Sequence, residues 1–187
     1  MIKGNRVADF IAEFIYSKLG VKHVFMVTGA GIMHLTDGVA LHGKLQTICP
    51  HHEQTSSMAI DAYSRVTENI GVGFFTSGPG GTNAITGLAG AWQDSVPCLF
   101  ISGQVKQKET TNDAKILGLR QFGVQELDMI PIVKSLCKYS VHLDNPKKVK
   151  YEFEKAVHIA KSGRPGPVWI QIPMDVQSTI VEEAKLE

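Results

Sequence analysis

The stretch GVGFFTSGPGGTNAITGLAGAWQDSVPCLFISGQ, residues 71–104, decides the fold. It opens with the apolar run VGFF (72–75), turns through TSGPGGTN (76–83), follows a helical pattern over 80–92, and returns to the apolar run VPCLFIS (96–102). Two strands joined by a helix are typical of a parallel pair, because the chain has to return to the starting end of the sheet before the second strand can run parallel to the first. Strands that are apolar throughout indicate a sheet covered on both faces.

The same alternation of helix and strand extends in both directions from this stretch. We predict helices over residues 5–20, 33–42, 53–68, 80–92, 124–137 and 145–163, and strands over 23–27, 45–49, 72–75, 96–102, 138–143 and 167–173. The pattern predicts one α/β domain over residues 1–187, a three-layer sandwich with a roughly six-stranded parallel sheet flanked by helices.

Composition excludes several classes of protein. The chain has 187 residues, of which 43% are hydrophobic and 20% charged, and its net charge is +1, as in ordinary soluble globular proteins. No basic excess points to nucleic acid. The apolar runs are too short to span a membrane and the first ten residues lack a signal-peptide block, so we expect a cytoplasmic protein. Three cysteines without paired spacing predict neither a disulfide framework nor a zinc site, and we expect all three in the core.

Four strand-to-helix turns concentrate the polar and glycine residues. In an open parallel sheet ligands bind beyond the carboxyl ends of the strands, which all lie at one edge. We therefore expect chemistry at the four turns TGAG (28–31), HHEQ (51–54), TSGPGGTN (76–83) and SGQV (102–105).

The glycine-rich turn at 76–83 has two interpretations. Gly78, Gly80 and Gly81 allow close backbone approach to an anionic ligand at the following helix. However, Asn83 stands where a dinucleotide fingerprint has its third glycine, and no lysine follows as in a phosphate loop. Spacing alone favours a tight structural turn, with Gly87 and Gly90 permitting close helix packing.

The HHEQ turn also has a structural interpretation. His51 and His52 are adjacent, so in an extended chain they point in different directions and make a poor metal pair. We predict no metal ligands in this chain. Taken locally, Glu53 is a first-turn carboxylate that the helix dipole stabilises.

The motifs together resemble a known family. HHEQTSSMAIDAYSR (51–65), TSGPGGTNAITGLAGAWQDSVPCLFISGQV (76–105), VQELD (124–128) and GRPGPVWIQIPMDVQ (163–177) are similar, in order and spacing, to the N-terminal pyrimidine-binding domain of thiamine-diphosphate enzymes of the acetolactate synthase group. The resemblance covers essentially the whole chain. It implies an enzyme that decarboxylates pyruvate or a related 2-oxo acid and joins the product to a second carbonyl, a lyase or transferase activity, with simple decarboxylation or oxidation as the enzymatic alternative.

The resemblance implies roles for individual residues. Glu53 would be catalytic, sharing a proton with a ring nitrogen of the cofactor's aminopyrimidine so that the imino tautomer is favoured. Gln125 would face the substrate, with Gln121 as the other candidate, because the segment TTNDAKILGLRQFG (110–123) is longer than in typical members. The cofactor-binding residues implied by similarity are Thr28, Gly29, Ala30, Gly31, Glu53, Thr76, Pro79, Gly80 and Asn83. TGAG departs from the Tyr-Pro-Gly-Gly common in the family, which puts contacts of that tyrosine or proline in question.

The resemblance also implies partners. The family holds the cofactor's diphosphate through magnesium on a separate domain marked by Gly-Asp-Gly, which this sequence lacks. We therefore expect middle and diphosphate-binding domains outside this chain, in the same polypeptide or a partner subunit, and at least a homodimer. FAD, carried by some members, is left open. Two other hypotheses are a non-catalytic or regulatory module that keeps the fold, and a nucleotide-binding domain.

Overall fold

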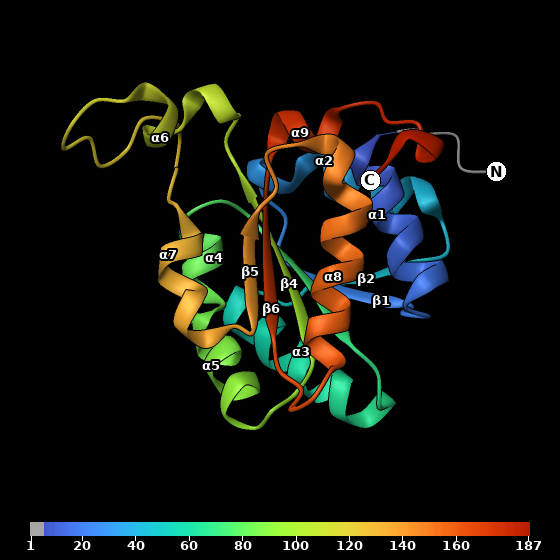
Figure 1. Cartoon of the computed structure of the whole chain (residues 1–187). Helices are drawn as coiled ribbons and strands as arrows, with labels where there is room; N and C mark the ends of the chain where they lie inside the picture. Colours follow the sequence, from blue (N-terminus) through green and yellow to red (C-terminus); the bar gives the residue numbers. More distant parts are fainter. Residues whose placement is uncertain (1–5) are drawn as a thin grey trace.

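The computed structural model describes residues 6–187 and has one parallel sheet at its centre (Figure 1). Within these residues the sheet has six strands in the order β2-β1-β3-β4-β6-β5. All five neighbouring pairs are parallel. The strands are β1 (His23–Met26), β2 (Gln46–Ile48), β3 (Gly71–Phe75), β4 (Cys98–Gln104), β5 (Tyr139–His142) and β6 (Val168–Pro173). The predicted α/β class and the parallel sheet are confirmed.

Helices cover both faces of the sheet and enclose two apolar cores (Figure 1). On one face pack α1 (Val7–Glu13), which continues as a π-helix (Phe14–Lys18), α2 (Met33–His42), α8 (Val149–Lys161) and α9 (Met174–Ser178). On the other face pack α3 (Glu53–Thr67), α4 (Pro79–Asn83), α5 (Ile85–Gln93) and α7 (Met129–Val133). This second core contains Phe75, Phe100 and Trp169, whose rings stack on adjacent strands with centroids 5.4–5.9 Å apart.

The remaining helical pieces are short. The helix α6 (Thr111–Ala114) lies in the segment between β4 and α7, which projects from one end of the sheet (Figure 1). Single 3-10 turns occupy Ala30–Ile32, Gln107–Glu109, Lys134–Leu136, Pro146–Lys148 and Glu183–Lys185. Within the described part of the chain, no helix combines the length and apolar character needed to cross a membrane.

Several predicted boundaries are wrong for identifiable reasons. The helix expected over 80–92 breaks at Ala84 into α4 and α5, because the glycine turn coils into a short helix of its own. The helix expected over 124–137 begins only at Met129, because Gln125 adopts φ 56° and the Asp128 carboxylate caps the Ile130 N–H. The strand expected to be buried over 45–49 is β2, the exposed edge strand. The helix α9 was not predicted, and Asn5, the predicted start of the first helix, lies outside the described residues.

One of the two glycines expected to permit helix packing does so. A Cβ on Gly87 would lie 2.6 Å from the Ser57 carbonyl carbon, so α5 approaches the backbone of α3 only because this side chain is missing. A Cβ on Gly90 would meet only Asp61 Oδ2, at 3.9 Å. The close approach of the two helices therefore depends on Gly87 and not on Gly90.

Alanine at these two positions should have opposite effects on stability. We predict that Gly87→Ala lowers the free energy of unfolding by about 1–3 kcal/mol, since backbone has to move to relieve the overlap. Gly90→Ala should leave it unchanged or raise it by up to about 1 kcal/mol, because alanine favours helix. Urea unfolding of both variants measures the difference. Equal effects would show that the α3–α5 contact does not depend on Gly87.

Candidate functional site

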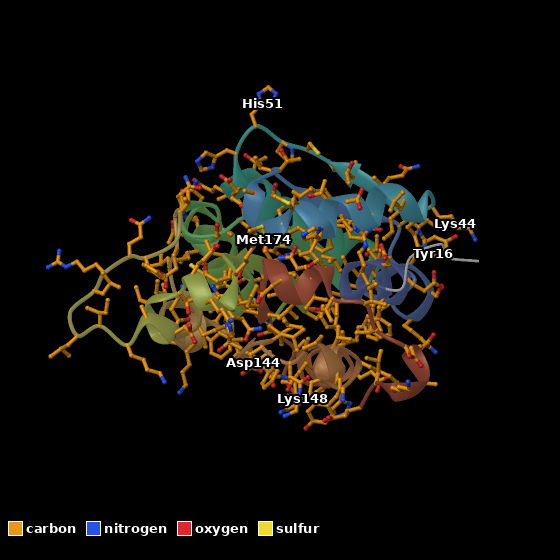
Figure 2. The ribbon with its side chains drawn as sticks, turned by 90° about the horizontal axis from the view of Figure 1, so that it is seen from above. Tyr16, Lys44, His51, Asp144, Lys148 and Met174 are labelled. Atoms are coloured by element: carbon orange, nitrogen blue, oxygen red, sulfur yellow. The ribbon has the colours of Figure 1, made fainter. Side chains whose placement is uncertain are left out.

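The strand order places a crevice between β1 and β3. The chain runs from β1 through α2 to β2 on one side, and then through α3 to β3 on the other side of β1, so α2 and α3 lie on opposite faces. A reversal of this kind opens a crevice at the carboxyl ends of the two central strands, where ligands bind in open α/β sheets. Figure 2 looks onto this carboxyl edge. The turns at 28–31, 51–54 and 76–83 meet there as predicted, whereas residues 102–104 of the fourth predicted turn belong to the buried end of β4.

Glu53 starts α3 and faces the glycine-rich turn. His52 precedes it as the helix cap, with extended backbone and a ring Nδ1 that accepts the Gln54 N–H at 3.1 Å. The half-buried Glu53 carboxylate accepts a hydrogen bond from Asn83 Nδ2 at 3.0 Å through Oε2. Its other oxygen, Oε1, lies 3.5 Å from where a Cβ on Gly80 would stand. Within residues 6–187 no hydrogen-bond donor reaches Oε1, so one carboxylate oxygen is oriented and the other is open to a ligand.

Thr76 is the contact point between the turns after β1 and β3. Its Oγ1 accepts the Gly31 N–H at 3.1 Å. A Cβ on Gly29 would lie 2.4 Å from Thr76 Cβ, and a Cβ on Gly80 would lie 2.6 Å from Thr76 Cγ2. Both glycines are therefore required by contacts within the protein, which explains them without a bound phosphate.

Gln125 lies against this cluster and Gln121 does not. Gly78 has φ +57°, and a Cβ on it would lie 2.1 Å from the Gln125 carbonyl oxygen, so the two backbones touch. The Gln125 side chain is exposed at this contact. In contrast, Gln121 Nε2 donates to the Gly123 carbonyl at 3.0 Å within its own loop. The geometry favours Gln125 as the glutamine nearest to the turns.

The base of the long segment before Gln125 is tied down by buried groups. Glu126 accepts the Thr111 N–H and hydroxyl, each at 2.8 Å, and the Phe122 N–H at 2.9 Å. Gln104 and Gln171 both donate to the Leu127 carbonyl, at 2.8 and 3.1 Å. A polar cavity of about 410 Å³ opens beside this base, at the ends of β4, β5 and β6. The base of the segment is therefore fixed to the carboxyl edge of the sheet by hydrogen bonds to buried side chains.

The other predicted site residues lie at the rims of the same turns. Thr28, Ala30 and Pro79 are exposed there, while Gly29, Gly31, Glu53, Thr76, Gly80 and Asn83 form the contacts just described. His51 points outward from the edge (Figure 2). No group of three or more histidine, cysteine, aspartate or glutamate side chains between residues 6 and 187 is arranged to hold a metal ion.

Comparison with known proteins agrees with this arrangement. Residues 5–132 match the family model described as thiamine pyrophosphate enzyme, N-terminal TPP binding domain. The chain belongs to this thiamine pyrophosphate enzyme family. That membership confirms the resemblance that the combined motifs predicted.

Individual relatives are acetolactate synthases. The chain is 39% identical over 168 residues to the acetolactate synthase large subunit of Buchnera aphidicola subsp. Acyrthosiphon pisum, covering 88% of this chain and 28% of that protein. It is 39% identical over 166 residues to the mitochondrial acetolactate synthase of Schizosaccharomyces pombe, covering 89% of this chain and 24% of the relative. The large subunit of isozyme 3 from Escherichia coli K12 is 36% identical over 168 residues, covering 88% and 28%. The chain thus spans about a quarter of the length of these relatives.

One residue at the edge, Gln177, was not predicted from the sequence as part of the site, and Gly103 was predicted only as part of the fourth turn. Gln177 on α9 and Gly103 on β4 both contact the Gly31 carbonyl oxygen. Gln177 lies within a motif that carries the family resemblance, but nothing in the spacing connects it to Gly31, which is far away along the chain. Only the sheet order brings them together.

The expectation that all three cysteines lie in the core is wrong for one of them. Cys98 and Cys137 are buried, but Cys49 is exposed in the turn before Glu53, because β2 is an edge strand. Burial raises the pKa of the Cys137 thiol to about 12 and raises the pKa of the Cys98 thiol further. Both buried sulfurs therefore remain protonated thiols at neutral and mildly alkaline pH.

Thiol labelling should distinguish these environments. We predict that a maleimide or disulfide reagent at pH 8 modifies about one cysteine per folded chain, because only a thiolate reacts and only Cys49 is accessible. All three should react in denaturant, and Cys49→Ser should abolish the labelling of the folded protein. Rapid labelling of two or three cysteines in the folded chain would contradict the buried positions of Cys98 and Cys137.

Proposed function

We propose that this chain is the pyrimidine-binding domain of a thiamine-diphosphate-dependent carboligase that decarboxylates a 2-oxo acid and transfers the remaining acyl carbon to a second carbonyl. The observation that carries the proposal is the Glu53 carboxylate, which starts a helix at the crevice with one oxygen held by Asn83 and the other open. The relatives are acetolactate synthases, which supports the reaction class. Thiamine diphosphate, when bound, supplies the thiazolium carbon that attacks the 2-oxo acid.

Glu53 would hold and share the proton that the cofactor's aminopyrimidine needs. Asn83 fixes the carboxyl plane through Oε2, so that Oε1 is presented toward the crevice in one orientation. A carboxyl group held in this way transfers a proton without first having to rotate, which lowers the cost of reaching the reactive geometry. Thr76, Pro79, Gly80 and Asn83 would wall the pyrimidine pocket, and residues 28–31 would contact the cofactor beside this pocket.

Gln125 would contact the substrate. Its exposed side chain next to the Gly78 turn supports this role, and the tied base of the 110–123 segment supports an ordered substrate-side wall. We propose pyruvate or a related 2-oxo acid as donor.

The remaining parts of the active site would come from other domains. We propose that magnesium and the cofactor's diphosphate are held by a diphosphate-binding domain, in the same polypeptide or a partner subunit, within at least a homodimer in the cytoplasm. This chain alone would then be inactive. The Glu53–Asn83 pair favours a catalytic enzyme over a non-catalytic module, because it orients the carboxylate and leaves Oε1 without a partner among the described residues.

Replacing Glu53 in the complete enzyme should separate proton handling from binding. We predict that Glu53→Gln lowers kcat for pyruvate by about 10²–10⁴-fold, the usual contribution of an acid–base group. The isosteric amide should change the thiamine diphosphate Kd far less. Steady-state kinetics and a direct binding titration measure the two effects.

Glu68→Gln is the matched control, since Glu68 is exposed at the opposite end of the same helix and should leave both quantities unchanged. Turnover of Glu53→Gln at the wild-type rate would refute the proposed role. Absence of thiamine diphosphate binding by the wild-type enzyme would refute the proposed function itself.

A further inference from the structure

The short helix α9 lies across the middle of the carboxyl edge. Figure 2 shows Met174, its first residue, near the centre of this edge. Gln177 on this helix has no solvent-accessible surface, with 0% exposure. Its Nε2 donates two hydrogen bonds, to the Gly31 carbonyl at 2.7 Å and to the Ile172 carbonyl at 2.8 Å. Gln177 therefore links the end of β6 to the turn that follows β1, although 146 residues separate it from Gly31.

The Gly31 peptide is held from three sides. Its N–H donates to Thr76 Oγ1 at 3.1 Å, and its carbonyl accepts from Gln177. A Cβ on Gly103 would lie 1.8 Å from the same carbonyl oxygen, so that oxygen rests directly on the backbone of β4. The position of the 28–31 turn is thus set jointly by the turn after β3, by β4 and by α9.

The hydrogen bonds of Gln177 indicate that this residue is needed for its donor atom, Nε2, and not for its oxygen, Oε1. Its Oε1 is buried, and no hydrogen-bond partner for it exists within residues 6–187. An orphaned buried oxygen is destabilising, and an apolar side chain of similar size would avoid that cost. The apolar side chain would, however, leave the Gly31 carbonyl without its donor. The amide N–H groups therefore account for a glutamine at this position.

We infer that Gln177 is a positioning residue for cofactor binding. It does not touch the cofactor; through the Gly31 carbonyl it fixes the 28–31 turn against Thr76, and this turn carries residues that we propose to bind the cofactor. The inference rests on the proposed function, because it assigns Gln177 a role in the same site. Loss of its donor should loosen the turn and weaken thiamine diphosphate binding more than it slows the chemistry.

The test compares two buried polar side chains, each of which lies within hydrogen-bond distance of two backbone carbonyl oxygens. Gln177→Met removes the donor at the carboxyl edge. Ser64→Ala is the matched control, because Ser64 is 3% exposed and its hydroxyl lies 2.5 Å from the Asn69 carbonyl and 2.8 Å from the Pro97 carbonyl, at the opposite end of the strands. The complete enzyme carrying each change is titrated with thiamine diphosphate and magnesium, and the Kd, the kcat at saturating cofactor and the Tm are measured.

We expect Gln177→Met to raise the thiamine diphosphate Kd about tenfold, as the loss of one buried hydrogen bond at the site would do. Its kcat at saturating cofactor should stay within about twofold of wild type, because Gln177 contacts no reacting group. Ser64→Ala should lower the Tm and leave the Kd within about twofold. Gly103→Ala, which displaces the same carbonyl from the other side, should weaken binding in the same way, as should Gln177→Leu if the methionine variant does not fold.

Two outcomes would overturn the inference in distinguishable ways. If the Gln177 and Gly103 variants fold and bind thiamine diphosphate within about twofold of wild type, Gln177 is only a structural residue and the proposed function stands. If the wild-type complete enzyme does not bind thiamine diphosphate, the proposed function fails and the inference fails with it. The wild-type titration alone separates these cases.

Discussion

The site depends on the contact between Thr76 and the backbone of the turn after β1. Gly29 and Gly80 bring backbone against two sides of the Thr76 side chain, at distances that no Cβ could tolerate. The Gly31 N–H completes the contact by donating to Thr76 Oγ1. Beside this contact the first turn of α3 faces the glycine-rich segment, and Asn83 reaches the Glu53 carboxylate. A side chain at either glycine would separate the walls of the crevice.

This contact is itself a consequence of the strand order. β1 and β3 are neighbours although a strand and two helices separate them in sequence, because the chain reverses direction across the sheet after β2. The reversal puts α2 and α3 on opposite faces and opens the crevice between their starting ends. α9 then covers the middle of the same edge and reaches the 28–31 turn through Gln177. The fold therefore supplies the location of the site, and a few close backbone contacts supply its shape.

The sequence predicts the layers of this fold better than the details of its carboxyl edge. Apolar strands and periodic helices are local signals, so the sheet, the start of α3 at Glu53 and the whole of α2 follow from them. The break at Ala84, the late start of α7 and the short α9 depend on contacts with distant residues. Local signals also made Glu53 an ordinary helix-start carboxylate, and only the combination of motifs along the whole chain suggested its role. Gln177 could not be assigned in this way, because its partner Gly31 lies at the other end of the sequence.

The proposed function depends on Glu53 sharing its proton with the aminopyrimidine of thiamine diphosphate. The most direct measurement is the rate at which the complete enzyme exchanges the cofactor's thiazolium C2 proton for deuterium, followed by quenched-flow NMR without substrate. The proposed role of Glu53 predicts exchange much faster than in free thiamine diphosphate, with the acceleration lost when glutamine replaces Glu53. Exchange no faster than in the free cofactor, or acceleration that survives the loss of this carboxylate, would contradict it.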